Sequence, residues 1–551
     1  MKKLILFFLI LISGAQAQNQ KEIDNFFKAS KDGDLQFLET VLKKYPDLIN
    51  TTHTNGWTAL MYASESNHLD IVKHLIEEGS DPNRGDNDGD RALMVASWFG
   101  HINVVKYLLS ENANINLKNN EGKTAIIYAS WANQLKVVKI LLEQKPELNF
   151  QDNEGWTALM FASNLGYKDV VQELLSRGAD VRIKDNNGKT ALINAAWKGD
   201  PAVVELLTKH GANVNVQDFN GDTALLVAAN QGHLDVVKYL SEQGSDLDTK
   251  DIYGKTALIK ASQKGYLDIV EYLVSQGIDI NTKDNKGKTA LNYALENEDT
   301  KVAEFFLSKT DDVDISSKDS NGVTPLMQAS KNGNLEAVKK IISKRVNISS
   351  KDNWGKSAFF YASENNHLNV VQELLNQGTD INEKNNKGET ALFVASFYGN
   401  LPIVKYLLSQ KANIDTTDND GNTAFIYSSK RNRILVVREL LSNGASKDAK
   451  AYNGMTALMH ASEQGNIEIV KYLLSQGVDV NNKAFNGMTA LMFAAKSGRL
   501  EIVKELASGG ADPSSKDNNG MTALFYASEN EHIPIVEFLE SLENTEKADF
   551  E

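Results

Sequence analysis

Hydrophobic and polar positions along this chain follow the period of short amphipathic helices, and the pattern returns at a fixed interval. Residues 191–196 are small or apolar and predict a first short helix, which Thr190 can cap and Gly199 can end. The i, i+3, i+4 spacing of Val171, Leu174 and Leu175 predicts a second helix in the preceding interval. Each interval therefore predicts a turn and two antiparallel helices, neither of which can bury its apolar face alone.

A glycine followed by x-Thr-Ala-Leu, or by a close variant, marks every interval. Successive marking glycines are 33 residues apart, except for one step of 35 residues from Gly287 to Gly322. A fixed period in this range predicts a stacked all-α repeat array instead of a fold with one core. The marking glycines are Gly56, Gly89, Gly122, Gly155, Gly188, Gly221, Gly254, Gly287, Gly322, Gly355, Gly388, Gly421, Gly454, Gly487 and Gly520.

The details of the repeated phrase point to a known family. Residues 155–159 read Gly-Trp-Thr-Ala-Leu, residues 232–237 read Gly-His-Leu-Asp-Val-Val, and residues 178–180 read Gly-Ala-Asp. With these elements the chain resembles the ankyrin repeat family over about residues 21–543. The resemblance implies an ankyrin repeat solenoid of about 16 stacked helix-turn-helix units with short hairpin turns, curved, with a concave face that binds other proteins.

The chain departs from the family phrase Thr-Pro-Leu-His. Only Thr324-Pro325-Leu326 keeps the proline, and the histidine is never present. In the family this histidine joins neighbouring repeats by hydrogen bonds, so we expect this array to rely more on apolar packing. Other histidines recur at the start of the predicted second helices, where we expect a structural role: His68, His101, His233, His367 and His532.

The N-terminal residues 1–17 do not fit the repeat. Lys2 and Lys3 precede an apolar run at residues 4–12, and Ala15-Gln16-Ala17 is a small-x-small cleavage site. This order predicts a secretory signal peptide that is cleaved after Ala17. We therefore expect an exported bacterial protein, periplasmic or secreted, without membrane insertion after cleavage.

The 35-residue step predicts a boundary between two blocks. Residues 361–368 resemble residues 62–69, and residues 394–399 resemble residues 95–100, which indicates a block duplication. We expect a first ankyrin block at residues 18–309, made of an N-terminal cap repeat and eight repeats, and a second block of seven repeats at residues 310–543. Residues 544–551 are predicted to form a disordered acidic tail. The array is expected to unfold in more than two states, with a first proteolytic cut near residues 311–320.

Composition narrows the function classes. The chain has no cysteine, which excludes disulfides and thiolate metal sites. Its net charge of −14 argues against a general nucleic-acid binder, because such a protein needs a basic face. Neither a metal-spaced histidine pair nor a nucleophile, base and oxyanion arrangement can be assembled from the repeats. We therefore predict no enzyme, no cofactor and no metal.

The tryptophans are the leading candidates for partner contacts. In the ankyrin family, the positions beside the turn glycine and at the end of the first helix face partners, and all six tryptophans fall there. Tryptophan is enriched in binding hot spots. Alternatively, each indole packs on its neighbour and only stiffens the array. The predicted partner-binding residues are Trp57, Trp98, Phe99, Trp131, Trp156, Trp197 and Trp354.

Lysines gather at turn and groove positions in the middle of the array. They are candidate contacts for acidic groups of a partner, unless they form only a solvated face. These residues are Lys255, Lys260, Lys264, Lys286 and Lys288.

The sequence thus predicts a non-enzymatic, monomeric protein–protein interaction scaffold. Its partners are expected to be proteins or peptides, bound by the concave face and the turn tips. Two alternatives stay open. One is a cell-envelope glycan-binding protein, because tryptophans also stack on sugar rings, and the other is a secreted effector that binds a host protein.

Overall fold

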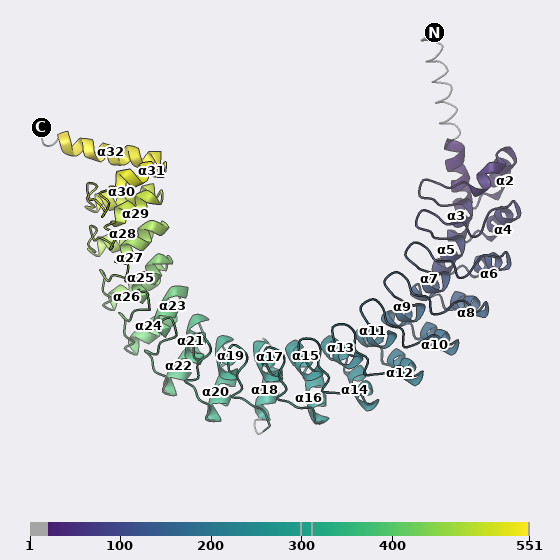
Figure 1. Cartoon of the computed structure of the whole chain (residues 1–551), viewed down its shortest axis with the longest axis horizontal. Coiled ribbons are helices and arrows are strands. Elements are labelled where there is room, and N and C mark those ends of the chain that lie inside the picture. Colours follow the sequence, from purple (N-terminus) through teal and green to yellow (C-terminus); the bar gives the residue numbers. More distant parts are fainter. Residues whose placement is uncertain (1–19, 298–299, 310–311, 549–551) are drawn as a thin grey trace, which may run out of the picture. The chain divides into compact units, whose positions relative to one another are not determined.

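The chain forms two compact units, one up to Asp279 and one from Ile280 onward, here called unit 1 and unit 2. The computed structural model describes residues 20–297, 300–309 and 312–548, and side chains up to residue 542. Each unit consists of helix pairs that stack in chain order (Figure 1). The helical repeat array predicted from the sequence is confirmed. The predicted signal peptide at residues 1–17 lies outside the described residues, and the predicted block boundary at residue 310 and the duplication stay predictions.

In unit 1 a helix at residues 20–32 precedes α2 (Leu35–Lys44) and the short 3₁₀ helix η1 (Pro46–Asn50). The first helices of the following pairs are α3 (Ala59–Glu65), α5 (Ala92–Phe99), α7 (Ala125–Trp131), α9 (Ala158–Leu165), α11 (Ala191–Lys198), α13 (Ala224–Gln231) and α15 (Ala257–Lys264). The second helices are α4 (Leu69–Glu77), α6 (Ile102–Ser110), α8 (Leu135–Glu143), α10 (Lys168–Ser176), α12 (Pro201–Lys209), α14 (Leu234–Glu242) and α16 (Leu267–Ser275).

Unit 2 repeats the same plan. Its first helices are α17 (Ala290–Glu296), α19 (Pro325–Lys331), α21 (Ala358–Glu364), α23 (Ala391–Tyr398), α25 (Ala424–Lys430), α27 (Ala457–Gln464), α29 (Ala490–Lys496) and α31 (Ala523–Glu529). Its second helices are α18 (Lys301–Ser308), α20 (Leu335–Ser343), α22 (Leu368–Asn376), α24 (Leu401–Ser409), α26 (Ile434–Ser442), α28 (Ile467–Ser475), α30 (Leu500–Ser508) and α32 (Ile533–Ala548). Because α32 continues to Ala548, the described part of the predicted disordered tail is helical.

The repeated phrase supplies the ends of the first helices. The Thr190 hydroxyl accepts a hydrogen bond from the backbone N–H of Ile193 at 3.4 Å, as the predicted N-cap requires. Gly199 ends the same helix with φ at +81°, a left-handed conformation that glycine adopts without strain. Both features follow from local chemistry, which is why the sequence alone predicts them.

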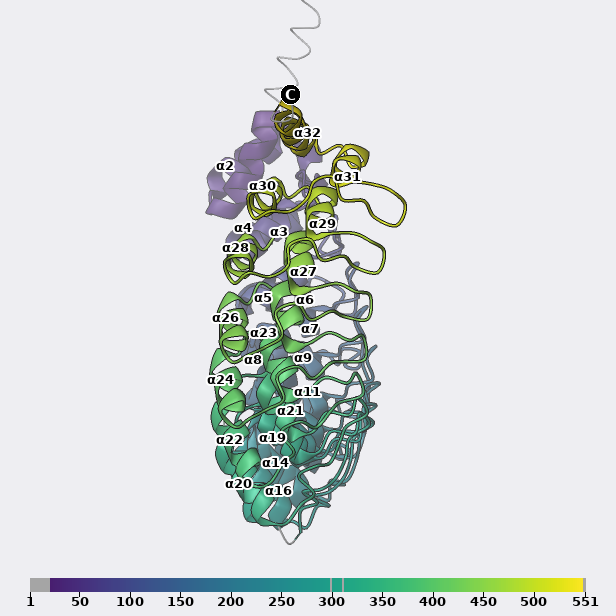
Figure 2. The same cartoon turned by 90° about the vertical axis from the view of Figure 1, so that its left-hand side faces the viewer.

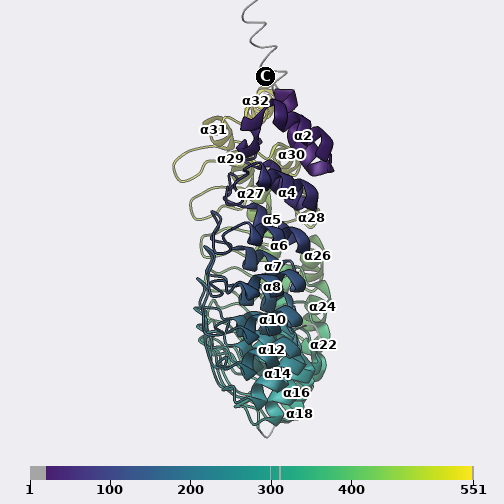
Figure 3. The same ribbon diagram turned by 90° about the vertical axis from the view of Figure 1, so that its right-hand side faces the viewer.

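Three layers run along each unit: the hairpin turns, the first helices and the second helices. Figure 2 shows them in unit 2 and Figure 3 in unit 1. The first helix α9 buries Ala158 and Ala162 together with Leu159 and Met160, and the second helix α10 buries Val171 and Leu174. Small residues let neighbouring first helices approach closely, and the larger residues of the second helices fill the outer layer. The core is therefore a continuous strip between the two helix layers of each unit.

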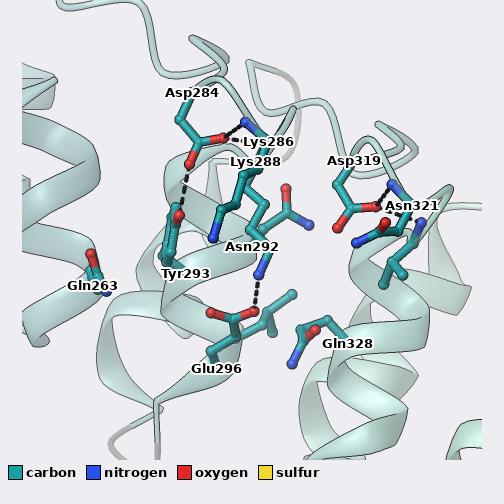
Figure 4. A network of polar contacts seen from close by, with 12 residues as sticks. Gln263, Asp284, Lys286, Lys288, Asn292, Tyr293, Glu296, Asp319, Asn321 and Gln328 are labelled. Carbon is teal, nitrogen blue, oxygen red and sulfur yellow. Dashed lines mark hydrogen bonds and ion pairs between the residues drawn. The ribbon is translucent and has the colours of Figure 1, made fainter. Parts of the chain in front are cut away.

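An acidic residue three positions before most marking glycines organises the hairpin turn. Asp284 Oδ1 accepts hydrogen bonds from the backbone N–H groups of Lys286 and Lys288, at 2.8 and 2.9 Å (Figure 4). Its other oxygen accepts the Tyr293 hydroxyl at 2.7 Å. The turn is thereby joined to the first helix of its own repeat. Asp352 with Tyr361 and Asp517 with Tyr526 form the same bond.

Polar ladders also join successive repeats. His101 Nε2 donates to the backbone carbonyl of Glu65 at 2.7 Å, and His233 Nε2 to that of Trp197 at 3.1 Å. The predicted structural role of the recurring histidines is confirmed, because His68, His367 and His532 also bind carbonyls of the preceding repeat. The expectation that apolar packing replaces the family's missing histidine is thus incomplete.

A second ladder follows the hairpin tips. Asn120 Nδ2 donates to the carbonyl of Asn87 at 3.0 Å, and Asn153 Nδ2 to that of Asn120 at 2.8 Å. The backbone N–H of Asn153 also reaches Glu121 O, at 2.8 Å. These hairpins therefore bind one another through main-chain and side-chain bonds, whereas hairpins with Phe219 or Phe485 at the asparagine position keep the main-chain bond.

Candidate functional site

An aromatic cluster crosses three consecutive first helices of unit 1. The Trp98 ring on α5 lies edge-on to the Trp131 ring on α7, with centroids 5.0 Å apart, and Trp131 stacks on Phe161 of α9 at 5.1 Å. Tyr128 adds an edge-on contact to Trp98 at 5.8 Å, and Trp156 contacts Phe161 at 5.0 Å. All five side chains are half-buried. We call this cluster of Trp98, Tyr128, Trp131, Trp156 and Phe161 the aromatic ladder.

Hydrogen bonds hold the Tyr128 side chain of the ladder in place. The Tyr128 hydroxyl donates to Asp90 Oδ1 at 2.9 Å, and Asn119 Nδ2 donates to the same oxygen at 2.9 Å. Burial raises the pKa of the Asp90 carboxyl despite these bonds, and burial together with the Asp90 charge raises the pKa of Tyr128. Lys123 pairs with Glu121, and its Nζ lies 5.1 Å from the Trp131 ring centroid. The ladder therefore presents aromatic rings that are already positioned in the free protein. The polar groups of Tyr128, Asp90 and Asn119 beside them are hydrogen-bonded to one another.

The other aromatic residues predicted in unit 1 lie outside the ladder. Trp57 packs on Tyr62 at 5.0 Å, beside the N-terminal helix residue Phe27. Phe99 is 46% exposed and stacks on the His101 ring, and Trp197 at the end of α11 is 52% exposed. The ladder therefore joins Trp98, Trp131 and Trp156 of the predicted set but leaves the others as separate contacts.

The predicted lysine cluster is divided between the units. Lys255, Lys260 and Lys264 belong to unit 1, whereas Lys286 and Lys288 belong to unit 2. Lys260 Nζ lies 2.8 Å from Asp222 and 2.7 Å from Asp251. Lys288 pairs with Glu296, and Lys255 Nζ donates to Gln263 at 2.7 Å. Lys264 and Lys286 are exposed. Two carboxylates of unit 1 already form ion pairs with Lys260. This lysine is therefore a poor contact for an acidic group of a partner.

The predicted residue Trp354 borders a groove in unit 2. The groove has a volume of ≈ 740 Å³ and lies along the first helices α21, α23 and α25 and the adjacent hairpins. Trp354 is 52% exposed at its edge. The aromatic and cationic lining consists of Trp354, Lys356, Tyr361, Lys387, Phe393, Phe397, Tyr398, Tyr427 and Arg431. We call this feature the unit 2 groove.

Internal bonds shape the walls of the unit 2 groove. Glu364 accepts the Lys356 ammonium and the Tyr398 hydroxyl, both at 2.7 Å. Burial and the Glu364 carboxylate raise the pKa of Tyr398 to about 12. The central carbon of the Arg431 guanidinium lies 4.5 Å from the Phe397 ring centroid, a cation–π contact that holds this side chain against the wall.

Most of the groove was not predicted from the sequence. Phe397 and Tyr398 occupy the repeat positions of Trp98 and Phe99, within the block resemblance noted above. The signal was present, but the sequence prediction kept Phe99 beside the tryptophans and did not extend to the equivalent residues Phe397 and Tyr398. Aromatic hairpin tips were missed for the same reason. Phe219, Tyr253, Tyr452 and Phe485 are between 62% and 71% exposed.

Comparison with known proteins decides the family. The family model for ankyrin repeats in sets of three copies matches overlapping stretches that together extend from residue 26 to residue 549. The chain belongs to the ankyrin repeat family. Ankyrin repeats indicate a protein–protein interaction scaffold, and the fold is typically non-enzymatic.

The curated relatives match only a short stretch. A region of 66 residues is 39% identical to the NAD-capped RNA hydrolase NUDT12 of Macaca fascicularis, and covers 12% of this chain and 14% of that protein. The human protein of the same name is 42% identical over 62 residues, which is 11% of this chain and 13% of that protein. The chain thus spans about a seventh or less of the length of these relatives, and their printed activity carries no argument for this chain.

The described residues contain neither a membrane-spanning helix nor a cluster of metal ligands. Within residues 20–297, 300–309 and 312–548, no helix has the length and apolarity needed to cross a bilayer. The same residues contain no group of three or more histidine or acidic side chains placed to hold a metal ion.

Proposed function

We propose that this protein is a non-enzymatic, exported scaffold that binds a protein or peptide through the aromatic ladder of unit 1. The observation that supports this most is the continuous contact of Trp98, Trp131 and Phe161 across three consecutive repeats. Aromatic side chains that are half-buried at rest lose little conformational entropy on binding and supply large contact areas. Such rings are the usual anchors of binding hot spots.

The rigid base of the ladder supports the same proposal. Tyr128 and Asn119 both donate to Asp90, so the ring of Tyr128 is fixed before any partner arrives. Inter-repeat bonds at the hairpin tips hold successive repeats in register. A preorganised surface of this kind converts contact area into affinity with a small ordering cost.

Export is part of the proposal and depends on residues 1–17 alone. A fusion of these residues to a cysteine-free reporter tests it by fractionation. Reporter in the periplasm or medium, cleaved after Ala17, supports export. Reporter retained in the cytoplasm at full length contradicts it.

A crosslinking pull-down tests the binding surface. Full-length protein is used as bait in cell-envelope and culture-supernatant fractions, beside a Trp98→Ala, Trp131→Ala variant. The matched control is Tyr107→Ala, Tyr239→Ala, which removes two half-buried rings from second helices of the same unit. A protein captured by wild type and by the control, but not by the ladder variant, supports the proposal.

Two other outcomes contradict it. Equal capture by all three proteins places the binding site away from the ladder. Binding of purified cell-envelope glycans that is lost in the ladder variant, without any captured protein, replaces the scaffold with the glycan-binding alternative.

A further inference from the structure

The last helix pair of unit 2, α31 and α32, exposes side chains at positions that are buried in the other repeats (Figure 1). Phe525 on α31 is 42% exposed, whereas the residues at its repeat position from Met61 to Met492 are between 0% and 3% exposed. Leu524 and Val536 are half-buried, although the residues at their positions one repeat earlier are buried. In the inner repeats the helices of the next repeat cover these positions, as α31 and α32 pack on α29 and α30.

Two glutamates of α32 lie at the same end of unit 2. Arg438 holds the repeat position of Glu537, and its guanidinium lies 4.8 Å from the centroid of a tyrosine ring in the next repeat. Thr208 holds the repeat position of Glu540, and its hydroxyl bonds a tyrosine of the next repeat at 2.7 Å. Both positions therefore point toward a following repeat. On α32, Glu537 and Glu540 are exposed there.

The charge of this end differs from that of the preceding repeats. Lysine holds the position of Glu537 in the two preceding repeats, and an apolar residue holds that of Glu540. Three cations lie nearby. Lys504 on α30 pairs with a glutamate of its own helix at 3.0 Å, Lys496 lies 5.5 Å from an aromatic ring centroid of α31, and Lys516 precedes the last hairpin. None of them belongs to α32, so the α32 part of the end is negatively charged.

We propose that this terminal face, formed by Leu524, Phe525, Val536, Glu537 and Glu540, binds an amphipathic helix of a partner protein in which lysine or arginine residues flank an apolar side. A helix fits because the same positions receive helices wherever another repeat follows. The apolar side of the partner helix covers the Phe525 ring and its neighbours, which supplies affinity. Its basic residues lie against the two glutamates and orient it.

A second copy of this chain fits the terminal face poorly. Inner repeats are joined by histidines such as His532, which donates to the carbonyl of Lys496 at 3.2 Å. Asp34 holds this position in the first helix pair, where its carboxylate accepts a backbone N–H of α2 and cannot donate. Two terminal faces placed against each other would bring Glu537 and Glu540 of both copies together, and like charges repel. These mismatches favour a basic helix from another protein.

Fluorescence anisotropy with the full-length protein tests the proposal. The probes are two labelled helical peptides of equal length with the same leucine pattern on one side, and with lysine at the polar positions of one and glutamate at those of the other. We expect the lysine peptide to bind and the glutamate peptide not to bind. Phe525→Ala should weaken binding of the lysine peptide about tenfold or more, as for a hot-spot ring.

The matched control for the ring is Phe37→Ala in unit 1. Phe37 is 36% exposed on α2, at a repeat position that is buried in the later repeats. This variant should bind the lysine peptide with the affinity of the wild type. Circular dichroism of each variant checks the fold.

A second pair of variants tests the charge without touching the apolar residues. Glu537→Gln, Glu540→Gln should weaken binding of the lysine peptide about fivefold, because exposed ion pairs are individually weak. The matched control is Glu271→Gln, Glu304→Gln, which removes two exposed carboxylates at the repeat position of Glu537 in inner repeats. The net charge of the protein changes equally in both variants, so non-specific attraction of a cationic peptide would fall equally.

Several results would overturn the proposal: equal binding of both peptides, an unchanged affinity in Phe525→Ala or in Glu537→Gln, Glu540→Gln, or an equal loss in the matched controls. Sedimentation equilibrium of the free protein should show a monomer, and a dimer that Phe525→Ala abolishes would replace the partner helix with a second copy. The proposal stands apart from the aromatic ladder, because Trp98→Ala, Trp131→Ala should keep full binding of the lysine peptide. Failure of one proposal therefore leaves the other intact.

Discussion

Unit 1 and unit 2 place different chemistry on the same repeat positions. Trp98 in unit 1 corresponds to Phe397 in unit 2, and both end a first helix. One helix further along, Trp131 corresponds to Lys430. The outcome is an aromatic ladder in unit 1 and, in unit 2, a groove whose lining combines aromatic rings with Lys387 and Arg431.

The small buried alanines beneath these surfaces are the same in both units, although larger core residues differ, as with Met94 and Phe393. Ala92 and Ala96 are buried in α5, and Ala391 and Ala395 are buried in the equivalent helix α23. Because these alanines and the polar ladders recur in both units, the exposed end of each first helix can vary without changing them. The same repeat scaffold therefore carries two different surfaces, the aromatic ladder in unit 1 and the groove in unit 2. The residues at the exposed ends of the first helices set the chemistry of each.

The largest expected effect is the loss of partner binding from unit 1. Removing the rings of Trp98 and Trp131 should cost about 4 kcal/mol of binding free energy, since each behaves as a hot spot of about 2 kcal/mol. Phe397→Ala in unit 2 should change the same affinity less than about twofold. Calorimetry with the captured partner measures both, and an equal loss in the two variants would end the distinction between the units.

A buried histidine predicts a pH response of unit 2. His460 on α27 is 5% exposed, and burial lowers its pKa from 6.5 to about 4. Below pH 6.5 the unfolded chain binds a proton that the folded chain does not, so stability falls between pH 6.5 and about 4. At pH 5 the loss should be about 2 kcal/mol.

Urea denaturation at pH 7 and pH 5 measures this loss. His460→Phe is the matched variant, because Phe493 holds the equivalent position in the next repeat. In this variant the free energy of unfolding should no longer show the loss between pH 7 and pH 5 that protonation of His460 causes. A wild-type pH difference that His460→Phe leaves intact would show that other groups cause it.

The hairpin aspartates should contribute unequally in the two units. Asp352 accepts two backbone N–H groups and the Tyr361 hydroxyl, whereas Asp152 accepts two backbone N–H groups opposite Phe161, which has no hydroxyl. Asp352→Ala should therefore destabilise the chain by about 1 kcal/mol more than Asp152→Ala. Thermal unfolding of the two variants tests the order, and an equal or reversed order would contradict the assigned role of the tyrosine bond.

The smallest expected effect is a gain. Phe161→Tyr in unit 1 brings a hydroxyl to the position from which Tyr361 reaches Asp352 in unit 2. One new hydrogen bond to the buried Asp152 should stabilise the protein by about 1 kcal/mol and keep the stacking on Trp131. A lower melting temperature in this variant would show that the hairpins of the two units are not interchangeable.

Much of the fold could be predicted from the sequence because its determinants are local. Thr190 and Gly199 bound a helix through their own hydrogen bonding and backbone freedom, and the fixed period of the marking glycines predicts the stacking. The structural role of His233 also followed from its place at the start of a second helix. These signals repeat many times, so each copy supports the others.

The remaining features depend on contacts between residues about one repeat apart. Asn120 looks like an ordinary turn residue in the sequence, yet its side chain binds the carbonyl of Asn87 in the previous hairpin. The lining of the groove combines Lys387 from a hairpin with Arg431 from the end of α25. Only the stacked structure brings such pairs together.

Hydroxyl-radical footprinting of the full-length protein with its captured partner tests the central claim most directly. Free protein should be labelled at Trp98, Trp131 and Phe161, which are half-buried, and at Tyr107 on α6. Partner binding should protect the three ladder rings and leave Tyr107 as reactive as before. Unchanged labelling of the ladder, with protection at Tyr107 or elsewhere on the second helices, would contradict the account.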